Sequence, residues 1–191
     1  MLRRALFAIL SLAFATAAIA GPKEDLHAAF TKFLAQTSFK GSIDSKMNNK
    51  PMHSTVEFQA PDRYRVTTDG RPPGIIIGST MYIDINGHSM KIPMPVGNTI
   101  AQYRNASILE QVERGMKIED LGMDSGGGLP AHKYRYTVTQ PHPSTSTIWV
   151  SSMSGLPVQL QTSQTMMGKA FETTIRYSNF SDSSIQIKAP N

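Results

Sequence analysis

The stretch IIIGSTMYIDINGHSMKIPMP, residues 75 to 95, carries the clearest fold signal in the chain. Asn86-Gly87 predicts a two-residue hairpin turn, because a type I′ turn needs positive φ at both central positions. Folding about this turn pairs Ile85 with His88, Ile83 with Met90, Met81 with Ile92 and Ser79 with Met94. Alternate strand residues point to opposite faces, so the large aliphatic side chains of these pairs share one face. The segment therefore predicts a β-hairpin with a single apolar side.

The same period of two occurs earlier in the chain. Residues 39 to 47 and 52 to 60 both alternate apolar with polar side chains. A four-residue loop at 48 to 51 would pair Met47 with Met52 and Ile43 with Val56. A three-residue loop around Pro61-Asp62 would then continue the apolar face with Tyr64, Val66 and Thr68.

Strands resume in the second half of the chain. They are expected at 132 to 140, 145 to 151, 156 to 165 and 170 to 178, with a short final strand at 185 to 187. The turn at 166 to 169 matches Leu160 with Ile175 and Val158 with Tyr177. The orientation of Trp149 stays open, because a four-residue turn at 152 to 155 pairs Trp149 with Val158, whereas a five-residue turn puts Ile148 there.

Two segments have helical spacing instead. The first is PKEDLHAAFTKFLAQT from Pro22, where Glu24 and Asp25 fall in the first turn as a helix N-terminus favours. The second lies between residues 98 and 121, with an apolar face of Ile100, Tyr103, Leu109, Val112 and Met116. Residues 122 to 130 (GMDSGGGLP) are expected to be a flexible loop.

This order of elements predicts a mainly β (α+β) fold. About ten antiparallel strands form a single sheet, and because large twisted sheets curl, we expect it to curve around the helices. No βαβ alternation and no internal repeat is found. One apolar sheet face with few helical residues to cover it favours a cavity for an apolar ligand such as an acyl chain.

The first twenty residues indicate export. Arg3 and Arg4 precede an apolar run that ends in Ala18-Ile19-Ala20, as in a secretory signal peptide cleaved before Gly21. Residues 21–191 then form a single domain, with no membrane span in the mature chain. The chain has no cysteine, so a hydrophobic core must hold it without disulfides. The expected location is the periplasm of a Gram-negative bacterium.

Several functional classes find no support. Removing Arg3 and Arg4 leaves 17 basic against 14 acidic residues, spread along the chain, so we expect no nucleic-acid partner. Nucleophile, phosphate-binding and zinc motifs are absent, and Ser125 in its glycine-rich stretch is more simply a turn residue. We therefore expect neither an enzyme nor a cofactor.

The methionines around the hairpin have two possible roles, copper binding and apolar packing. Met81, Met90 and Met94 with His88 have donor atoms that suit copper(I). Methionine also fills irregular apolar surface and adapts to varied partners. The hairpin register favours the second interpretation, and no metal site is expected.

Several short patterns, taken in order, resemble the LolA/LolB-like superfamily. They are FQAPDRYRV (58 to 66), IIIGSTMYI (75 to 83), IWVSSMSGLPVQL (148 to 160), TTIRYSNF (173 to 180) and IKAP (187 to 190). The chain is also similar to the LppX/LprG type and to the N-terminal domain of RseB. The resemblance implies a lidded antiparallel half-barrel that receives lipid or lipoprotein acyl chains and has no catalytic residue.

The sequence therefore predicts a non-enzymatic periplasmic carrier that binds lipid or lipoprotein acyl chains in an apolar cavity between the sheet and a helical lid. Its expected partners are these acyl chains and an envelope protein that delivers or accepts them. The expected cavity residues are Phe39, Ile43, Val56, Phe58, Tyr64, Val66, Met81, Ile83, Met90, Ile92, Tyr136, Leu160 and Ile175, and the expected lid residues are Leu26, Phe30, Phe33 and Leu109. An envelope-stress or protein-interaction module on the same fold remains an alternative, and a periplasmic hydrolase is a third.

Overall fold

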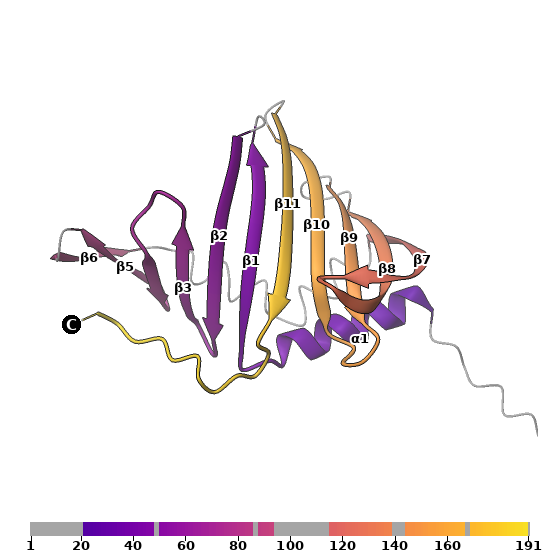
Figure 1. Cartoon of the computed structure of the whole chain (residues 1–191), viewed down its shortest axis with the longest axis horizontal. Coiled ribbons are helices and arrows are strands. Elements are labelled where there is room, and N and C mark those ends of the chain that lie inside the picture. Colours follow the sequence, from indigo (N-terminus) through magenta and orange to yellow (C-terminus); the bar gives the residue numbers. More distant parts are fainter. Residues whose placement is uncertain are drawn as a thin grey trace, which may run out of the picture.

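The computed structural model describes residues 21–47, 50–85, 88–93, 115–138, 144–166 and 169–190. They form one helix and an eleven-stranded antiparallel sheet (Figure 1). The elements are α1 (Pro22–Leu34), β1 (Ser38–Met47), β2 (Lys50–Gln59), β3 (Arg63–Thr68), β4 (Gly74–Ile77), β5 (Thr80–Ile85), β6 (His88–Pro93), β7 (Lys117–Gly126), β8 (Leu129–Val138), β9 (Ser144–Ser151), β10 (Pro157–Met166) and β11 (Lys169–Ser178). This confirms the mainly β prediction.

The sheet joins two runs of hairpins at its centre. Its strand order is β6-β5-β4-β3-β2-β1-β11-β10-β9-β8-β7, so every neighbour except β1 and β11 is consecutive in sequence. The sheet is open, with β6 and β7 at its two ends. The pairing of β1 with β11 therefore holds the two halves of the chain together.

Helix α1 forms where the sequence supplies favourable helix ends. Pro22 occupies the first turn, where a missing N–H costs nothing, and Glu24 and Asp25 lie near the positive end of the helix dipole. Leu26 and Ala29 are buried against the sheet. We call the sheet face that α1 covers the inner face and the opposite one the outer face. Among the described residues, no helix has the length and apolar character of a membrane span.

The predicted pairings are mostly confirmed. Ile85 pairs with His88, Ile83 with Met90, Met81 with Ile92 and Leu160 with Ile175. The expected β1–β2 register was wrong by two residues, since Met47 pairs with Lys50 and Ile43 with Ser54. The connection is two residues long, the commonest hairpin length. A shift of two keeps every side chain on its predicted face.

The predicted loop at 122 to 130 was wrong, and so was the helical assignment of residues 117 to 121. Both segments belong to the β7–β8 hairpin, which turns at Gly127-Gly128 with φ of 57° and 82°. A register irregularity between Asp120 and Met123, with Gly122 at φ 76°, interrupts the alternation of β7. Such a bulge hides the period of two from a sequence pattern.

Residues 185 to 187 do not form the predicted final strand. The Ile187 N–H donates to Oε1 of Gln59 at 2.7 Å, and the Ile187 carbonyl accepts from Arg63 at 2.8 Å. The side chains of Gln59 and Arg63 therefore bond the backbone groups of Ile187 that a neighbouring strand would otherwise pair. The signal peptide, the Asn86-Gly87 turn, the Ser79–Met94 pair, Leu109 and the second helix as far as residue 114 lie outside the described residues.

The structure also decides the orientation of Trp149. A register shift between Pro157 and Gln159 places Gln159 opposite Trp149 and Leu160 opposite Ile148. Ile148 is therefore on the inner face with Leu26, whereas Trp149 packs with Ala131 and Val158.

The packing of α1 predicts a large effect of Leu26→Ala. Leu26 is 1% exposed among Tyr134 and Ile148, so truncation should lower the free energy of unfolding by about 2–5 kcal/mol. Thr31→Ala, on the exposed side of the same helix, should change it by less than about 0.5 kcal/mol. Urea unfolding followed by Trp149 fluorescence measures both, and equal losses would mean that α1 is not docked through Leu26.

Candidate functional site

Charged side chains gather on the outer face of the sheet. The ion pairs are Lys40–Glu57 (3.1 Å), Arg65–Glu57, Arg176–Asp44 (2.7 Å), His53–Asp44 (2.8 Å), Lys133–Asp124 (2.9 Å) and Arg135–Glu119 (3.0 Å). Each pair bridges neighbouring strands, where opposite charges stabilise the sheet. The strands place charge on one face and leave the other available for apolar contacts.

These pairs hold their carboxylates in the ionised form. Hydrogen bonds from His53 and Arg176 lower the pKa of Asp44. Burial alone would raise the pKa of Glu57, but the hydrogen bonds and charges of Lys40 and Arg65 outweigh it, and the pKa is lowered.

The carboxylate of Asp124 lies beside Trp149 on the outer face. Hydrogen bonds from Lys133, the Ser125 N–H and the Trp149 indole lower the pKa of Asp124 to about 2. Lys133 also lies 5.1 Å from the centre of the Trp149 ring. Ser125 thus contributes a backbone N–H to a structural contact, which explains its position without catalysis.

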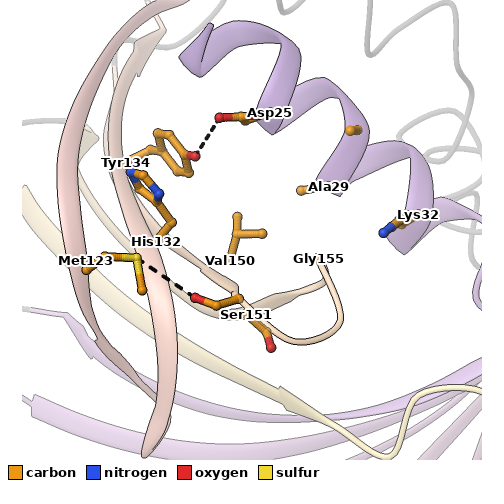
Figure 2. A pocket seen from close by; sticks show the side chains of 11 residues that line it. Asp25, Ala29, Lys32, Met123, His132, Tyr134, Val150, Ser151 and Gly155 are labelled. Atoms are coloured by element: carbon orange, nitrogen blue, oxygen red, sulfur yellow. Dashed lines mark hydrogen bonds between the residues drawn. The ribbon is translucent and has the colours of Figure 1, made fainter. Parts of the chain in front are cut away.

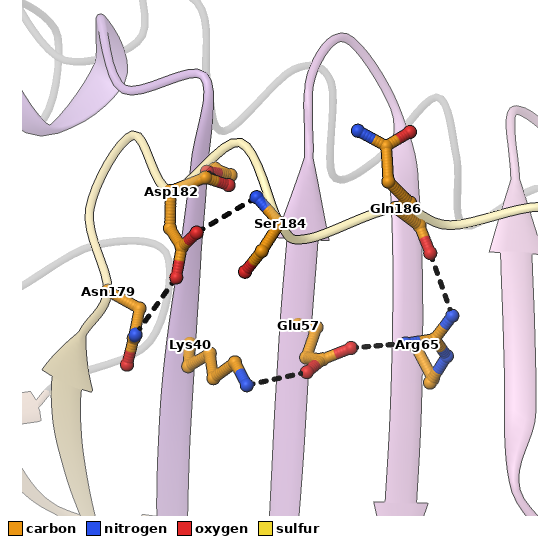
Figure 3. Close-up of polar contacts among 8 residues, drawn as sticks. Lys40, Glu57, Arg65, Asn179, Asp182, Ser184 and Gln186 are labelled. Carbon is orange, nitrogen blue, oxygen red and sulfur yellow. Dashed lines mark hydrogen bonds and ion pairs between the residues drawn. The ribbon is translucent and has the colours of Figure 1, made fainter.

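The C-terminal segment covers part of the outer face (Figure 3). It crosses the strands β1 to β3, where Arg65 donates to the Gln186 carbonyl at 3.0 Å. Two residues of this segment, Ile185 and Ile187, are buried. The chain therefore uses this part of the outer face for its own packing.

The inner face contains a buried aromatic row. Phe39, Phe58 and Tyr64 lie side by side on β1, β2 and β3, with ring centroids 5.0 and 5.1 Å apart. Phe33 of α1 packs on this row, 5.0 Å from Phe39 and 5.0 Å from Tyr177. Phe58 is fully buried. This part of the inner face is permanent core.

Toward β6 the inner face becomes exposed. The register continues the apolar side with Met81, Ile83 and Ile85 on β5 and Met90 and Ile92 on β6. The exposed fractions of Ile85, Met90 and Ile92 are 43%, 49% and 37%. We call these five residues, with Val56 and Val66 beside them, the open apolar surface. Exposed apolar area of this kind, continuous with a core, is typical of a binding site.

The register places all thirteen predicted cavity residues on the inner face, but in four different surroundings. Phe39, Phe58 and Tyr64 form the aromatic row, and Val56, Val66 and Met81 pack against it. Tyr136 and Leu160 pack with the second cluster, around Leu26, and Ile43 and Ile175 form a cross-strand pair between the clusters. Ile83, Met90 and Ile92 belong to the open apolar surface. The predicted lid residues Leu26, Phe30 and Phe33 all contact this face from α1.

A groove that the sequence did not predict lies between α1 and the strands β7 to β9 (Figure 2). It has a volume of about 450 Å³, and its lining residues are Asp25, Ala28, Ala29, Lys32, Met123, His132, Tyr134, Val150, Ser151, Ser152 and Gly155. No sequence signal relates these residues, because they come from segments about 100 positions apart.

The groove is a joint between helix and sheet. The Tyr134 hydroxyl donates to Asp25 at 3.0 Å, and Lys32 donates to the Ser154 carbonyl at 3.3 Å. Burial, the hydrogen bond to Asp25 and the charge of that carboxylate raise the pKa of Tyr134. His132 stacks on Tyr134 and lies 2.6 Å from Asp120. These polar contacts fix α1, and they suit an acyl chain less well than the open apolar surface.

The structure was also compared with the arrangements of side chains that bind metal ions. Within the described ranges, no group of three or more His, Cys, Asp or Glu residues is placed to hold a metal ion. Met81, Met90 and His88 lie on β5 and β6, while Met94 is outside the described residues.

Comparison with known proteins identifies the fold. The chain is similar to the lipoprotein LppX of Mycobacterium tuberculosis, with a TM-score of 0.64 and 10% identity over 87% of this chain and 97% of LppX. The chain has the fold of LppX. LprF of Mycobacterium bovis gives a TM-score of 0.59 with 14% identity, over 89% of this chain and 96% of LprF. No protein-family model and no curated protein sequence matches the chain.

A chain of the MucA/MucB complex of Pseudomonas aeruginosa also has this fold. Its TM-score is 0.54 and its identity 14%, over 90% of this chain and 59% of the other. These comparisons confirm the resemblance stated from the sequence at the level of the fold.

The division of the inner face predicts unequal effects of two truncations. Phe58→Ala, in the aromatic row, should lower the free energy of unfolding by about 3–5 kcal/mol. Met90→Ala, on the open apolar surface, should lower it by less than about 1 kcal/mol because little burial is lost. Urea unfolding compares them, and a loss at Met90 as large as that at Phe58 would show that the surface is closed.

The ion pairs of Glu57 predict an acid-dependent contribution to stability. The pKa of Glu57 is lower in the folded protein than the 4.5 of an ordinary glutamate, so its contribution is complete above pH 4.5 and is lost as the pH falls through the folded value. Glu57→Gln should lower stability at pH 7 by about 0.2–1 kcal/mol, and the difference should shrink below pH 4.5. Glu172→Gln, at an exposed outer position, is the control. A constant difference at all pH values would exclude this linkage.

Proposed function

We propose that this protein is a non-enzymatic periplasmic carrier that binds the acyl chains of a lipid or lipoprotein on the open apolar surface. The observation that carries the proposal is the exposure of Ile85, Met90 and Ile92 on the same face as the buried aromatic row. A surface of this kind is stabilised when an apolar ligand excludes water from it. The ligand would extend the core across β4 to β6.

The distribution of charge supports an apolar ligand. The ion pairs of Lys40, Arg65 and Arg176 are on the outer face, so an acyl chain on β2 to β6 would not desolvate them. Each buried methylene contributes about 0.8 kcal/mol, and ten would give about 8 kcal/mol before the costs of association. Micromolar binding needs about 8.2 kcal/mol after those costs, so more than ten methylenes must be buried, as two acyl chains allow.

The proposed periplasmic location and transfer role are based on residues 1–20 and on the proteins that share the fold. Residues 1–20 would direct export and be removed, leaving residues 21–191 as one domain. LppX, which shares the fold, is itself a lipoprotein. In this proposal the chain receives acyl chains from one envelope protein and yields them to another.

A protein-interaction module is the second candidate. The fold is shared with a chain of a MucA/MucB complex. Within the described ranges β6 pairs only with β5, and all six of its residues are exposed. An exposed edge strand can accept an extended segment of a partner. This function requires a stable protein partner and no lipid.

Native mass spectrometry of protein purified gently from the periplasm separates the two candidates. The carrier proposal predicts a mass excess that lipid analysis assigns to an acyl lipid. A protein of bare polypeptide mass that retains a stoichiometric protein partner would favour the interaction module instead. Turnover of ester or glycoside substrates would overturn both.

Ile83→Asp should abolish lipid capture. Ile83 lies on β5 opposite Met90, and a carboxylate there would have to be desolvated against the acyl chain. Thr67→Asp places the same charge at an exposed position of the outer face and should retain bound lipid. Native mass spectrometry reports the lipid, and circular dichroism confirms that both variants fold. Full lipid occupancy in folded Ile83→Asp would contradict the proposed site.

A further inference from the structure

A row of five hydroxyl groups crosses the inner face at a single register. Its members lie on five adjacent strands, in the order Tyr136 on β8, Ser146 on β9, Thr162 on β10, Thr173 on β11 and Ser45 on β1. We call them the hydroxyl row. Neither the predicted cavity residues nor the proposed acyl surface accounts for it, except that Tyr136 was predicted to line the cavity.

The hydroxyl row lies directly beside apolar side chains. The neighbouring register on the same face consists of Tyr134, Ile148, Leu160, Ile175 and Ile43 on the same five strands. Ser146 is 4% exposed, so its hydroxyl is removed from bulk water. A buried hydroxyl destabilises a fold unless it is hydrogen-bonded. The row therefore needs partners.

The hydrogen bonds within the row do not use all of its donors. Ser146 and Thr162 are joined by a hydrogen bond of 2.9 Å. These two hydroxyls have two donors, and the one bond between them leaves one donor for another acceptor.

The two remaining members, Ser45 and Thr173, make weaker hydrogen bonds or none. Ser45 donates to the Met52 carbonyl at a long 3.4 Å. Thr173 is half-buried, and its hydroxyl has no hydrogen-bond partner among the described residues. Its cross-strand neighbours are Thr162 and Ser45. A spare donor is thus available in the middle of the row.

We propose that the hydroxyl row binds the ester carbonyl oxygens of a diacyl lipid whose acyl chains extend across β1 and β2 onto the open apolar surface. This inference rests on the proposed carrier function and names its ligand class. An ester carbonyl is an uncharged acceptor, so it matches neutral hydroxyl donors in a partly buried site. The row selects ester-linked chains over the corresponding ethers, whose oxygen is a weaker acceptor and whose carbonyl is missing.

The test compares two lipids that differ only at this linkage. Mature protein is incubated with equal amounts of dipalmitoyl phosphatidylglycerol and its dihexadecyl ether counterpart, and native mass spectrometry gives the ratio of the two bound forms. Chain length and head group are the same, so the apolar contribution nearly cancels. The proposal predicts that the ester is preferred by roughly fivefold, the effect of about one hydrogen bond.

Three variants assign the preference to the row. Thr173→Val and Thr162→Val keep the side-chain shape but remove a hydroxyl from the inner face, so both should bring the ester-to-ether ratio toward one. Thr174→Val removes the neighbouring hydroxyl on the outer face of β11 and should keep the wild-type ratio. Circular dichroism shows that each variant is folded, and a ratio within one sample does not depend on its active fraction.

The outcomes are distinct. Equal binding of ester and ether by the wild type overturns the role of the hydroxyl row and leaves the carrier function standing. An ester preference that both Thr173→Val and Thr162→Val retain also overturns it, because the preference then arises elsewhere. Uptake of neither lipid contradicts the carrier function and this inference together.

Discussion

The contact between Phe33 of α1 and the aromatic row of Phe39, Phe58 and Tyr64 is the interaction on which the rest of the structure depends. It places the helix on one face of the sheet and so makes that face the inner one. Tyr177 of β11 reaches the same cluster, which joins the C-terminal half of the sheet to the N-terminal half. Aromatic pairs at these separations add to the free energy of simple burial.

The aromatic row also limits where a ligand can bind. Phe58 and Leu26 already have the protein itself as their partner, so the region beneath α1 is not available without moving the helix. The inner face beyond this region extends to β6 and exposes Met90 and Ile92. The fold thus separates a fixed core from an open apolar surface, while the strand period of two keeps the ion pairs of Lys40, Arg65 and Arg176 on the outer face. Binding and folding therefore use the same apolar face at different strands.

Much of this arrangement could be predicted from the sequence because side-chain facing depends only on alternation. The β1–β2 register was wrong by two residues, yet Ile43 and Val56 remained on the inner face. The β7 strand was missed because Gly122 and a bulge break its alternation. Trp149 could not be oriented, since the register shift near Pro157 is set by tertiary packing. The groove beside Asp25 and the hydroxyl row combine residues from distant segments, and only the strand order brings them together.

Photo-crosslinking with an acyl lipid that carries a diazirine near the end of its chain tests the central claim most directly. Irradiated complexes are digested, and the modified residues are located by mass spectrometry. The account predicts modification of inner-face residues of β2 to β6, such as Val66, Ile83 and Met90, and none of their outer-face neighbours Arg65 and Tyr82. Crosslinks concentrated on the outer face, or in the groove beside Asp25 and Lys32, would contradict it.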